Sequence, residues 1–305
     1  MSTGITRRTE DAAARAFWDG LRRSTQARIG LGRTGDTLSI AEVLEFRAAH
    51  AAARDAVHSP LHVAGLAAEV AALGLGEAVH VRSLARDRSE YLRRPDLGRL
   101  PGSAVAAREE GIGAANSAGG HTIWSGAGAR GAMSAVPHSG ADVGFVLADG
   151  LSPRALADHG VPMLAALIEA LGDRYTVAPP VIATQARVAL GDHIGAALGV
   201  GMVLVLIGER PGLSVADSLG IYLTHRPRPG RADSERNCVS NIHPPEGLSY
   251  ARAARVATGL VDGARRLGRS GVDLKDTSGG KTLVSEASPE APGLGHALVS
   301  DAKGD

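Results

Sequence analysis

Short apolar runs alternate with segments of helical apolar spacing along the second half of the chain. The runs are brief, rich in Val, Ile and Leu, and bounded by Gly, Pro or charged residues, which is typical of strands. Strands are therefore predicted over residues 142–150, 179–190, 202–207, 221–225 and 238–243. Helices are predicted over residues 153–172, 191–199 and 250–267, with a brief helical turn at 214–219. This alternation predicts an α/β, Rossmann-like fold over residues 141–276, with a mostly parallel sheet and flanking helices.

Residues 1–100 instead carry apolar residues at helical spacing, so we expect a helical N-terminal region ahead of the sheet. Ser39 and Glu42 have the separation of a capping box, which predicts the start of a helix that runs to about Val57. Further helices are predicted over residues 11–23, 60–73 and 78–92.

Two segments are rich in Gly, Ser and Ala and lack a steady apolar period. We expect residues 101–140 to form a Gly-rich flexible insertion, and residues 277–305 to form a disordered tail. The chain is thus predicted to consist of a helical region, an insertion, one Rossmann-like domain and a tail.

The composition limits the classes of function that are expected for this chain. Aromatic residues make up 3% of the chain, so the core must be packed from small aliphatic side chains, which suits helices lying on a parallel sheet. Lys and Arg total 33 against 32 for Asp and Glu, with no long basic run, so nucleic-acid binding is not expected. One cysteine excludes an internal disulfide and a cysteine-based zinc cluster. The N-terminus lacks a signal-peptide core and no apolar run approaches about 18 residues, so a cytoplasmic protein without a membrane segment is expected.

Polar residues follow directly on the apolar run 202–207, and they form the strongest candidate site. Ligands of open α/β sheets bind at the carboxyl ends of strands, where Glu209 and Arg210 are expected. The Pro and Gly that follow would hold the Glu209 carboxylate as a hydrogen-bond acceptor, although a solvated corner has the same pattern. Cys238 has polar flanks, which fit either inert packing or a position that faces a ligand or partner.

Other motifs of known chemistry are incomplete. Gly30, Gly32 and Gly35 match GxGxxG, with Asp55 further on, but the residues before them do not read as a strand. A stand-alone Rossmann-type oxidoreductase that uses NAD(P) is therefore kept as an alternative. No HExxH or GxSxG sequence occurs, so neither a protein metal site nor a serine nucleophile is predicted.

Several longer stretches are specific in sequence. They are TQARIGLGR (25–33), EFRAAHAAARDAVH (45–58), DVGFVLADGLS (142–152), QARVALGDHIG (185–195), IGERPGLSVADSLGIYL (207–223), RPGRADSERNCVSNI (228–242) and SGVDLKD (270–276). With these stretches, residues 25–276 resemble the small subunit of ethanolamine ammonia-lyase, and GERPGL followed by ERNCVSNI is the most specific feature. Residues 101–140 and the tail after residue 276 depart from the family pattern.

The resemblance implies a subunit of an adenosylcobalamin-dependent enzyme that deaminates ethanolamine to acetaldehyde and ammonia by a radical mechanism. It implies that a large subunit, a TIM barrel, holds ethanolamine, and that cobalamin lies between the two subunits. Heterodimers assembled into a larger oligomer are expected, with this chain inactive alone. The N-terminal segment of the family can direct packaging in a bacterial microcompartment, but the charges of residues 7–21 fit a plain exposed helix equally well.

The resemblance also carries cofactor-binding positions onto Val188, Glu209 and Cys238, all of which we interpret as lying at strand ends. Val188 would offer apolar surface or backbone groups, Glu209 would accept hydrogen bonds from the corrin amides or the nucleotide loop, and Cys238 would pack as a small soft contact. None of these roles needs acid–base chemistry, so no catalytic residue is expected. His193 stands in Asp-His-x-Gly, not in the Asp-x-His-x-x-Gly of domains that ligate cobalt, which agrees with a cofactor that keeps its own benzimidazole ligand. A scaffold for the large subunit without cofactor contact is a further alternative.

Overall fold

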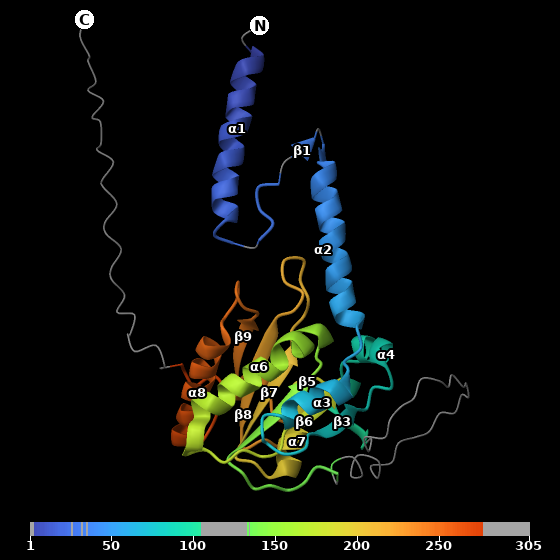
Figure 1. Cartoon of the computed structure of the whole chain (residues 1–305), viewed down its shortest axis with the longest axis vertical. Coiled ribbons are helices and arrows are strands. Elements are labelled where there is room, and N and C mark those ends of the chain that lie inside the picture. Colours follow the sequence, from blue (N-terminus) through green and yellow to red (C-terminus); the bar gives the residue numbers. More distant parts are fainter. Residues whose placement is uncertain are drawn as a thin grey trace, which may run out of the picture.

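A computed structural model describes residues 3–25, 27–31, 33–34, 36–104, 133 and 135–276. The chain has an α/β architecture in which helices flank a mixed seven-stranded sheet of order β4-β3-β6-β5-β7-β8-β9 (Figure 1). The strands are β3 (Val79–Ser83), β4 (Pro101–Ala104), β5 (Val143–Ala148), β6 (Val181–Thr184), β7 (Met202–Gly208), β8 (Leu219–His225) and β9 (Arg236–Ile242). A separate two-stranded sheet pairs β1 (Arg33–Thr34) with β2 (Thr37–Leu38).

The sheet is parallel at its centre and antiparallel at both sides. Strands β3, β6, β5 and β7 pair in parallel, whereas β4, β8 and β9 join by antiparallel pairing. The prediction of a mostly parallel sheet is therefore wrong for the strands outside the centre. A parallel neighbour needs a crossover connection, usually a helix, and residues 209–218 between β7 and β8 form no helix.

Helices cover the two faces of the sheet unequally (Figure 1). They are α1 (Thr3–Arg22), α2 (Ile40–His58), α3 (Val63–Ala71), α4 (Arg88–Arg93), α6 (Pro153–Leu171), α7 (Leu190–Leu198) and α8 (Tyr250–Leu267). Helices α3, α6 and α8 share one core cluster with Phe145, Leu204 and Ile221. On the opposite face, α7 packs against Val146 and Val205, which alternate with those residues along the same strands.

The antiparallel side of the α7 face is less covered. Tyr222 of β8 is half-buried there, and its cross-strand partner Cys238 of β9 is exposed. We call the surface formed by Tyr222 and Cys238 the open sheet face. Val239, the next residue of β9, points to the other side and is buried with α8 in the larger core cluster.

Several predicted elements are confirmed at their ends. Helix α2 begins after Ser39, whose Oγ accepts a hydrogen bond from the Glu42 N–H at 3.3 Å, as the capping box predicts. Helix α6 begins at Pro153 after the N-cap Ser152, and α7 ends at Gly199 in the left-handed conformation. These signals act within one helical turn, so local sequence is sufficient to read them.

Three predicted elements are wrong. The segment predicted as a helix over 78–92 instead contains β3 and the short helix α4, so the N-terminal region contributes a strand to the seven-stranded sheet. The strand predicted over 179–190 ends at Thr184, because Gln185 has a left-handed backbone with φ of +53°. The turn predicted as helical at 214–219 lacks helix, and β8 begins at Leu219.

The structure describes part of the predicted insertion and none of the predicted tail. Strand β4 occupies the first residues of the segment 101–140, and Val136 near its end is buried in the α7-side core. Residues 105–132 lie outside the described part of the chain, as does the predicted tail 277–305.

One helix among the described residues, α6 with its short extension to Arg174, is long and apolar enough by composition to cross a membrane. Its apolar residues Leu156, Met163, Leu164 and Leu167 are fully buried in the core. The core helix of a globular protein can have the same length and apolar composition, and α6 is packed in the core in this way.

Candidate cofactor site on the sheet

Glu209 lies at the carboxyl end of β7, where the sequence predicts it. Its Oε2 accepts a hydrogen bond from the Ser218 hydroxyl at 2.6 Å and another from the Asn241 N–H at 3.3 Å. The side chain passes over Gly220 of β8, where a Cβ atom would come within 2.8 Å of Glu209 Oε1. Hydrogen bonds from Ser218 and Asn241 therefore hold this carboxylate in one orientation, and the absence of a side chain at Gly220 leaves room for it.

The prediction that Cys238 lies at a strand end is wrong. Cys238 lies within β9, on the open sheet face. Although the residue is exposed, partial burial of its thiol raises the pKa of Cys238. A hydrogen bond with Tyr222 opposes this shift, and the nearby Glu209 charge adds to it. Burial also raises the pKa of Tyr222 to about 12, with smaller contributions from Cys238 and Glu209. Both groups are therefore neutral at pH 7, so they can pack and hydrogen-bond but are not poised as nucleophile or base.

Val188 lies in the turn between β6 and α7, beyond the strand end at which it was predicted. It is half-buried, and its carbonyl accepts a hydrogen bond from the Gly191 N–H at 2.9 Å. Val188 and Tyr222 both pack against the core cluster beneath α7. The structure thus brings Glu209 and Cys238 within electrostatic reach and places Val188 on the same face of the sheet.

A buried carboxylate that the sequence reading missed shapes this turn. Asp149, at the carboxyl end of β5, accepts hydrogen bonds from the N–H groups of Gln185 at 2.8 Å and Ala186 at 2.9 Å. Burial raises the pKa of Asp149 to about 6, against the opposing effect of these N–H groups and of Arg88, whose Nη1 lies 3.6 Å away. The carboxylate is ionised at pH 7, and it holds Gln185 in a conformation that is uncommon for a residue with a side chain.

The side chain of Gln185 has an unmatched acceptor. Its Oε1 is buried without a hydrogen-bond partner among the described residues. Buried polar atoms in native proteins nearly always have a partner, so an orphan acceptor together with a positive φ indicates a functional position.

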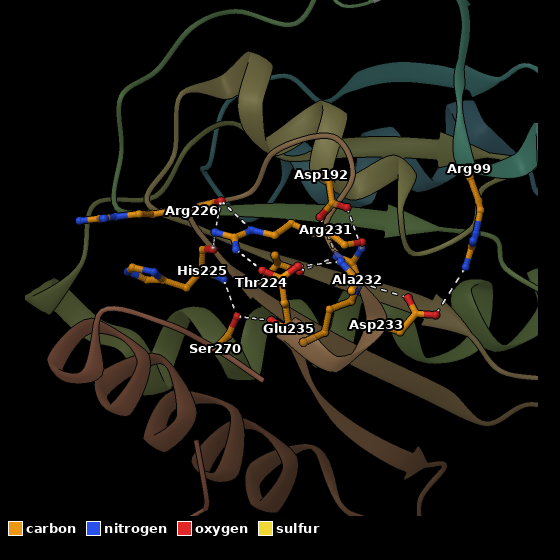
Figure 2. A network of polar contacts seen from close by, with 11 residues as sticks. Arg99, Asp192, Thr224, His225, Arg226, Arg231, Ala232, Asp233, Glu235 and Ser270 are labelled. Carbon is orange, nitrogen blue, oxygen red and sulfur yellow. Dashed lines mark hydrogen bonds and ion pairs between the residues drawn. The ribbon is translucent and has the colours of Figure 1, made fainter. Parts of the chain in front are cut away.

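A buried ion pair joins helix α7 to strand β9 within a larger network of polar contacts (Figure 2). Arg236 of β9 donates to both carboxylate oxygens of Asp192 in α7, at 2.6 and 2.7 Å, and both side chains are at most 2% exposed. The same guanidinium also donates to Thr224 Oγ1 and to the Arg231 carbonyl. Because Arg236 precedes Cys238 by two residues, this network fixes β9 against α7 beside the open sheet face.

Other candidates from the sequence have less support. The residues before Gly30 form α1 and its exit, and the described ones include no strand that could precede a GxGxxG loop; Gly32 and Gly35 lie outside the described residues. His193 lies half-buried on α7, and burial lowers its pKa. Among the described residues, no group of three or more His, Cys, Asp or Glu side chains could hold a metal ion.

Comparison with known proteins matches this chain over nearly its whole length. The family model for "Ethanolamine ammonia-lyase light chain (EutC)" matches residues 15–112 and 127–275. The ethanolamine ammonia-lyase small subunit of Rhodococcus erythropolis is 59% identical over 91% of this chain and 97% of its own. The corresponding subunit of Rhodopseudomonas palustris is 46% identical over 90% and 95% of the two chains, and that of Pseudomonas syringae is 43% identical over 95% and 94%. The chain therefore belongs to the ethanolamine ammonia-lyase small-subunit family, and its sheet presents Glu209, Tyr222 and Cys238 together.

Proposed function

We propose that this chain is the cobalamin-binding small subunit of an adenosylcobalamin-dependent ethanolamine ammonia-lyase. It acts in complex with a large subunit that holds the substrate, and the complex converts ethanolamine to acetaldehyde and ammonia. Membership of the family supports the reaction. The observation that carries the cofactor role is the preoriented Glu209 carboxylate beside the open sheet face.

The described residues fit the chemistry of a corrin. Its ring is broad and largely apolar, and its rim carries neutral amide side chains that can donate hydrogen bonds. The neutral Tyr222 and Cys238 offer a surface for such a ring, because neither brings a charge that would have to be desolvated. Oxygen acceptors are available for these amides. Ser218 and Asn241 both donate to Glu209 Oε2, which leaves Oε1, and Gln185 Oε1 has no partner among the described residues.

In this proposal the chain positions the cofactor and performs no proton transfer. Adenosylcobalamin, when bound, supplies a carbon-centred radical by cleavage of its cobalt–carbon bond. Glu209 Oε1 accepts a hydrogen bond from a corrin amide, and Cys238 and Tyr222 contact the ring. The Val188 turn supports the rim and excludes water from it. Because Ser218 and Asn241 already hold Glu209, little conformational entropy is lost on binding.

A partner subunit is also consistent with the exposed apolar side chains of the N-terminal helices. They are Phe17, Trp18 and Leu21 on α1 and Ile40, Leu44 and Phe46 on α2. Apolar side chains that gather on a surface mark interaction sites in soluble proteins. We infer a heterodimer with the large subunit that assembles further, in the cytoplasm or inside a bacterial microcompartment.

Loss of the proposed contacts is expected to weaken cobalamin binding. Replacing Glu209 and Cys238 together by Ala in the coexpressed complex should raise the Kd for adenosylcobalamin about ten- to hundred-fold, since a hydrogen bond to a charged group contributes roughly 1.5–3 kcal/mol. The Kd is measured by titration of cobalamin absorbance. Glu169→Ala provides the matched control, because Glu169 is exposed on α6 at the opposite face.

An unchanged Kd in the double variant would favour the scaffold alternative, in which this chain holds the large subunit without contacting the cofactor. The reaction itself is tested by copurifying the chain with a candidate large subunit. Ammonia release from ethanolamine should require both chains and adenosylcobalamin. Turnover by this chain alone would contradict the proposal.

A further inference from the structure

Two arginines stack on one tyrosine ring at the edge of the sheet next to the proposed cofactor contacts. The guanidinium carbon of Arg88 lies 4.8 Å from the centroid of the Tyr91 ring, and that of Arg187 lies 4.5 Å from it. Tyr91 is fully buried, and its hydroxyl donates to the Ala186 carbonyl at 3.0 Å. Arg187 directly precedes Val188 in the turn that Asp149 shapes, so the cluster adjoins a predicted cofactor contact.

The charges of this cluster do not balance. Arg88 donates to the carbonyls of Val57 and Gly150 and pairs with Asp149 at 3.6 Å, so its charge has a counterion. Arg187 has no carboxylate within 4.0 Å among the described residues, and its Nε lacks a hydrogen-bond partner. Arg187 is half-buried, so its unneutralised guanidinium is only partly hydrated. This arrangement suits an anion at the carboxyl edge of β6.

We propose that Arg187 binds the phosphodiester in the nucleotide loop of adenosylcobalamin. This inference rests on the proposed function. The phosphodiester is the anionic group of the cofactor, because its corrin side chains are neutral amides. A guanidinium presents two parallel N–H donors that match two phosphate oxygens, and the Tyr91 ring holds its plane in a fixed orientation. Arg187 would thus add a contact selective for an anion to the proposed contacts of Glu209, Tyr222 and Cys238.

The test compares ligands that differ in the phosphate. The coexpressed complex, as wild type and as Arg187→Leu, is titrated with adenosylcobalamin, adenosylcobinamide phosphate and adenosylcobinamide, and binding is followed by absorbance. Arg187→Leu should raise the Kd for the two phosphate-bearing ligands about ten- to hundred-fold. The Kd for adenosylcobinamide should stay unchanged. Arg187→Lys should restore part of the loss, because Lys keeps the charge but not the two-pronged geometry.

Arg94→Leu is the matched control for removal of a charge, since Arg94 is exposed and pairs with Asp96 on the surface. If Arg187→Leu raises the Kd for adenosylcobinamide as much as the Kd for adenosylcobinamide phosphate, the inference is wrong. It is also wrong if the Kd for all three ligands is unchanged. Neither result contradicts the proposed function. If the wild-type complex binds none of the three, the proposed function fails, and this inference fails with it. If the Arg187→Leu chain does not assemble with the large subunit, the same three ligands are compared with the Arg187→Lys variant.

Discussion

Replacing Arg236 by Met is expected to lower the free energy of unfolding by about 3–5 kcal/mol, because it leaves the carboxylate of Asp192 buried without a counterion. Asp192 is 1% exposed, and each of its carboxylate oxygens accepts a hydrogen bond from Arg236. Thr224 Oγ1 and the Arg231 carbonyl lose a donor in the same variant. Urea-induced unfolding, followed by far-UV circular dichroism, measures the difference.

The double variant Asp192→Leu/Arg236→Met distinguishes an unpaired charge from lost packing. It should regain at least half of the lost free energy, because replacing both partners of a buried ion pair by apolar residues is often neutral. Arg154→Met is the surface control: Arg154 and Asp158 are exposed, so the expected loss is below about 1 kcal/mol. A double variant as unstable as Arg236→Met would show that the buried charge of Asp192 is not the cause.

Replacing Asp149 by Ala is expected to cost a similar amount, about 3–5 kcal/mol, because Arg88 is then buried without its counterion. The N–H groups of Gln185 and Ala186 also lose their acceptor, so the Val188 turn should loosen and cobalamin binding should weaken. Unfolding in urea measures the stability, and absorbance titration of the complex measures the binding. Asp96→Ala serves as the control, because Asp96 is exposed in its pair with Arg94.

The stability difference between wild type and Asp149→Ala should depend on pH. The pKa of Asp149 is about 6 in the folded chain, above the ordinary value of 3.8, so protonation favours the folded state. The stabilisation that comes from protonating Asp149 is fully present below pH 4 and is lost as the pH rises through about 6. The wild type should therefore exceed Asp149→Ala by more at pH 5 than at pH 7, and a difference that shrinks at pH 5 would contradict the raised pKa.

The parallel centre of the sheet could be predicted from the sequence because its strands are buried on both faces. Strands β5 and β7 are buried at every residue, so they appear as continuous apolar runs. Strand β3 has only alternate residues buried, and its short run was read as part of a helix. The directions of β8 and β9 depend on the connections between strands, which no apolar pattern encodes.

The candidate site was predictable only where a local signal exists. Glu209 could be found because it follows a buried strand directly. Gly220 and Tyr222 became visible only through the register of β8 with its neighbours. The turn at Gln185 could not be read locally, since its conformation depends on Asp149, which lies 36 residues earlier. The roles of Val188, Glu209 and Cys238 in binding the cofactor stay predictions.

In the proposed site, the missing side chain at position 220 offers an indirect way to change the affinity for the corrin. A methyl group there would come within 2.8 Å of Glu209 Oε1 and would displace the Glu209 carboxylate. A substitution at position 220 would therefore weaken the proposed hydrogen bond to the corrin while Glu209, Tyr222 and Cys238 all keep their chemical identity.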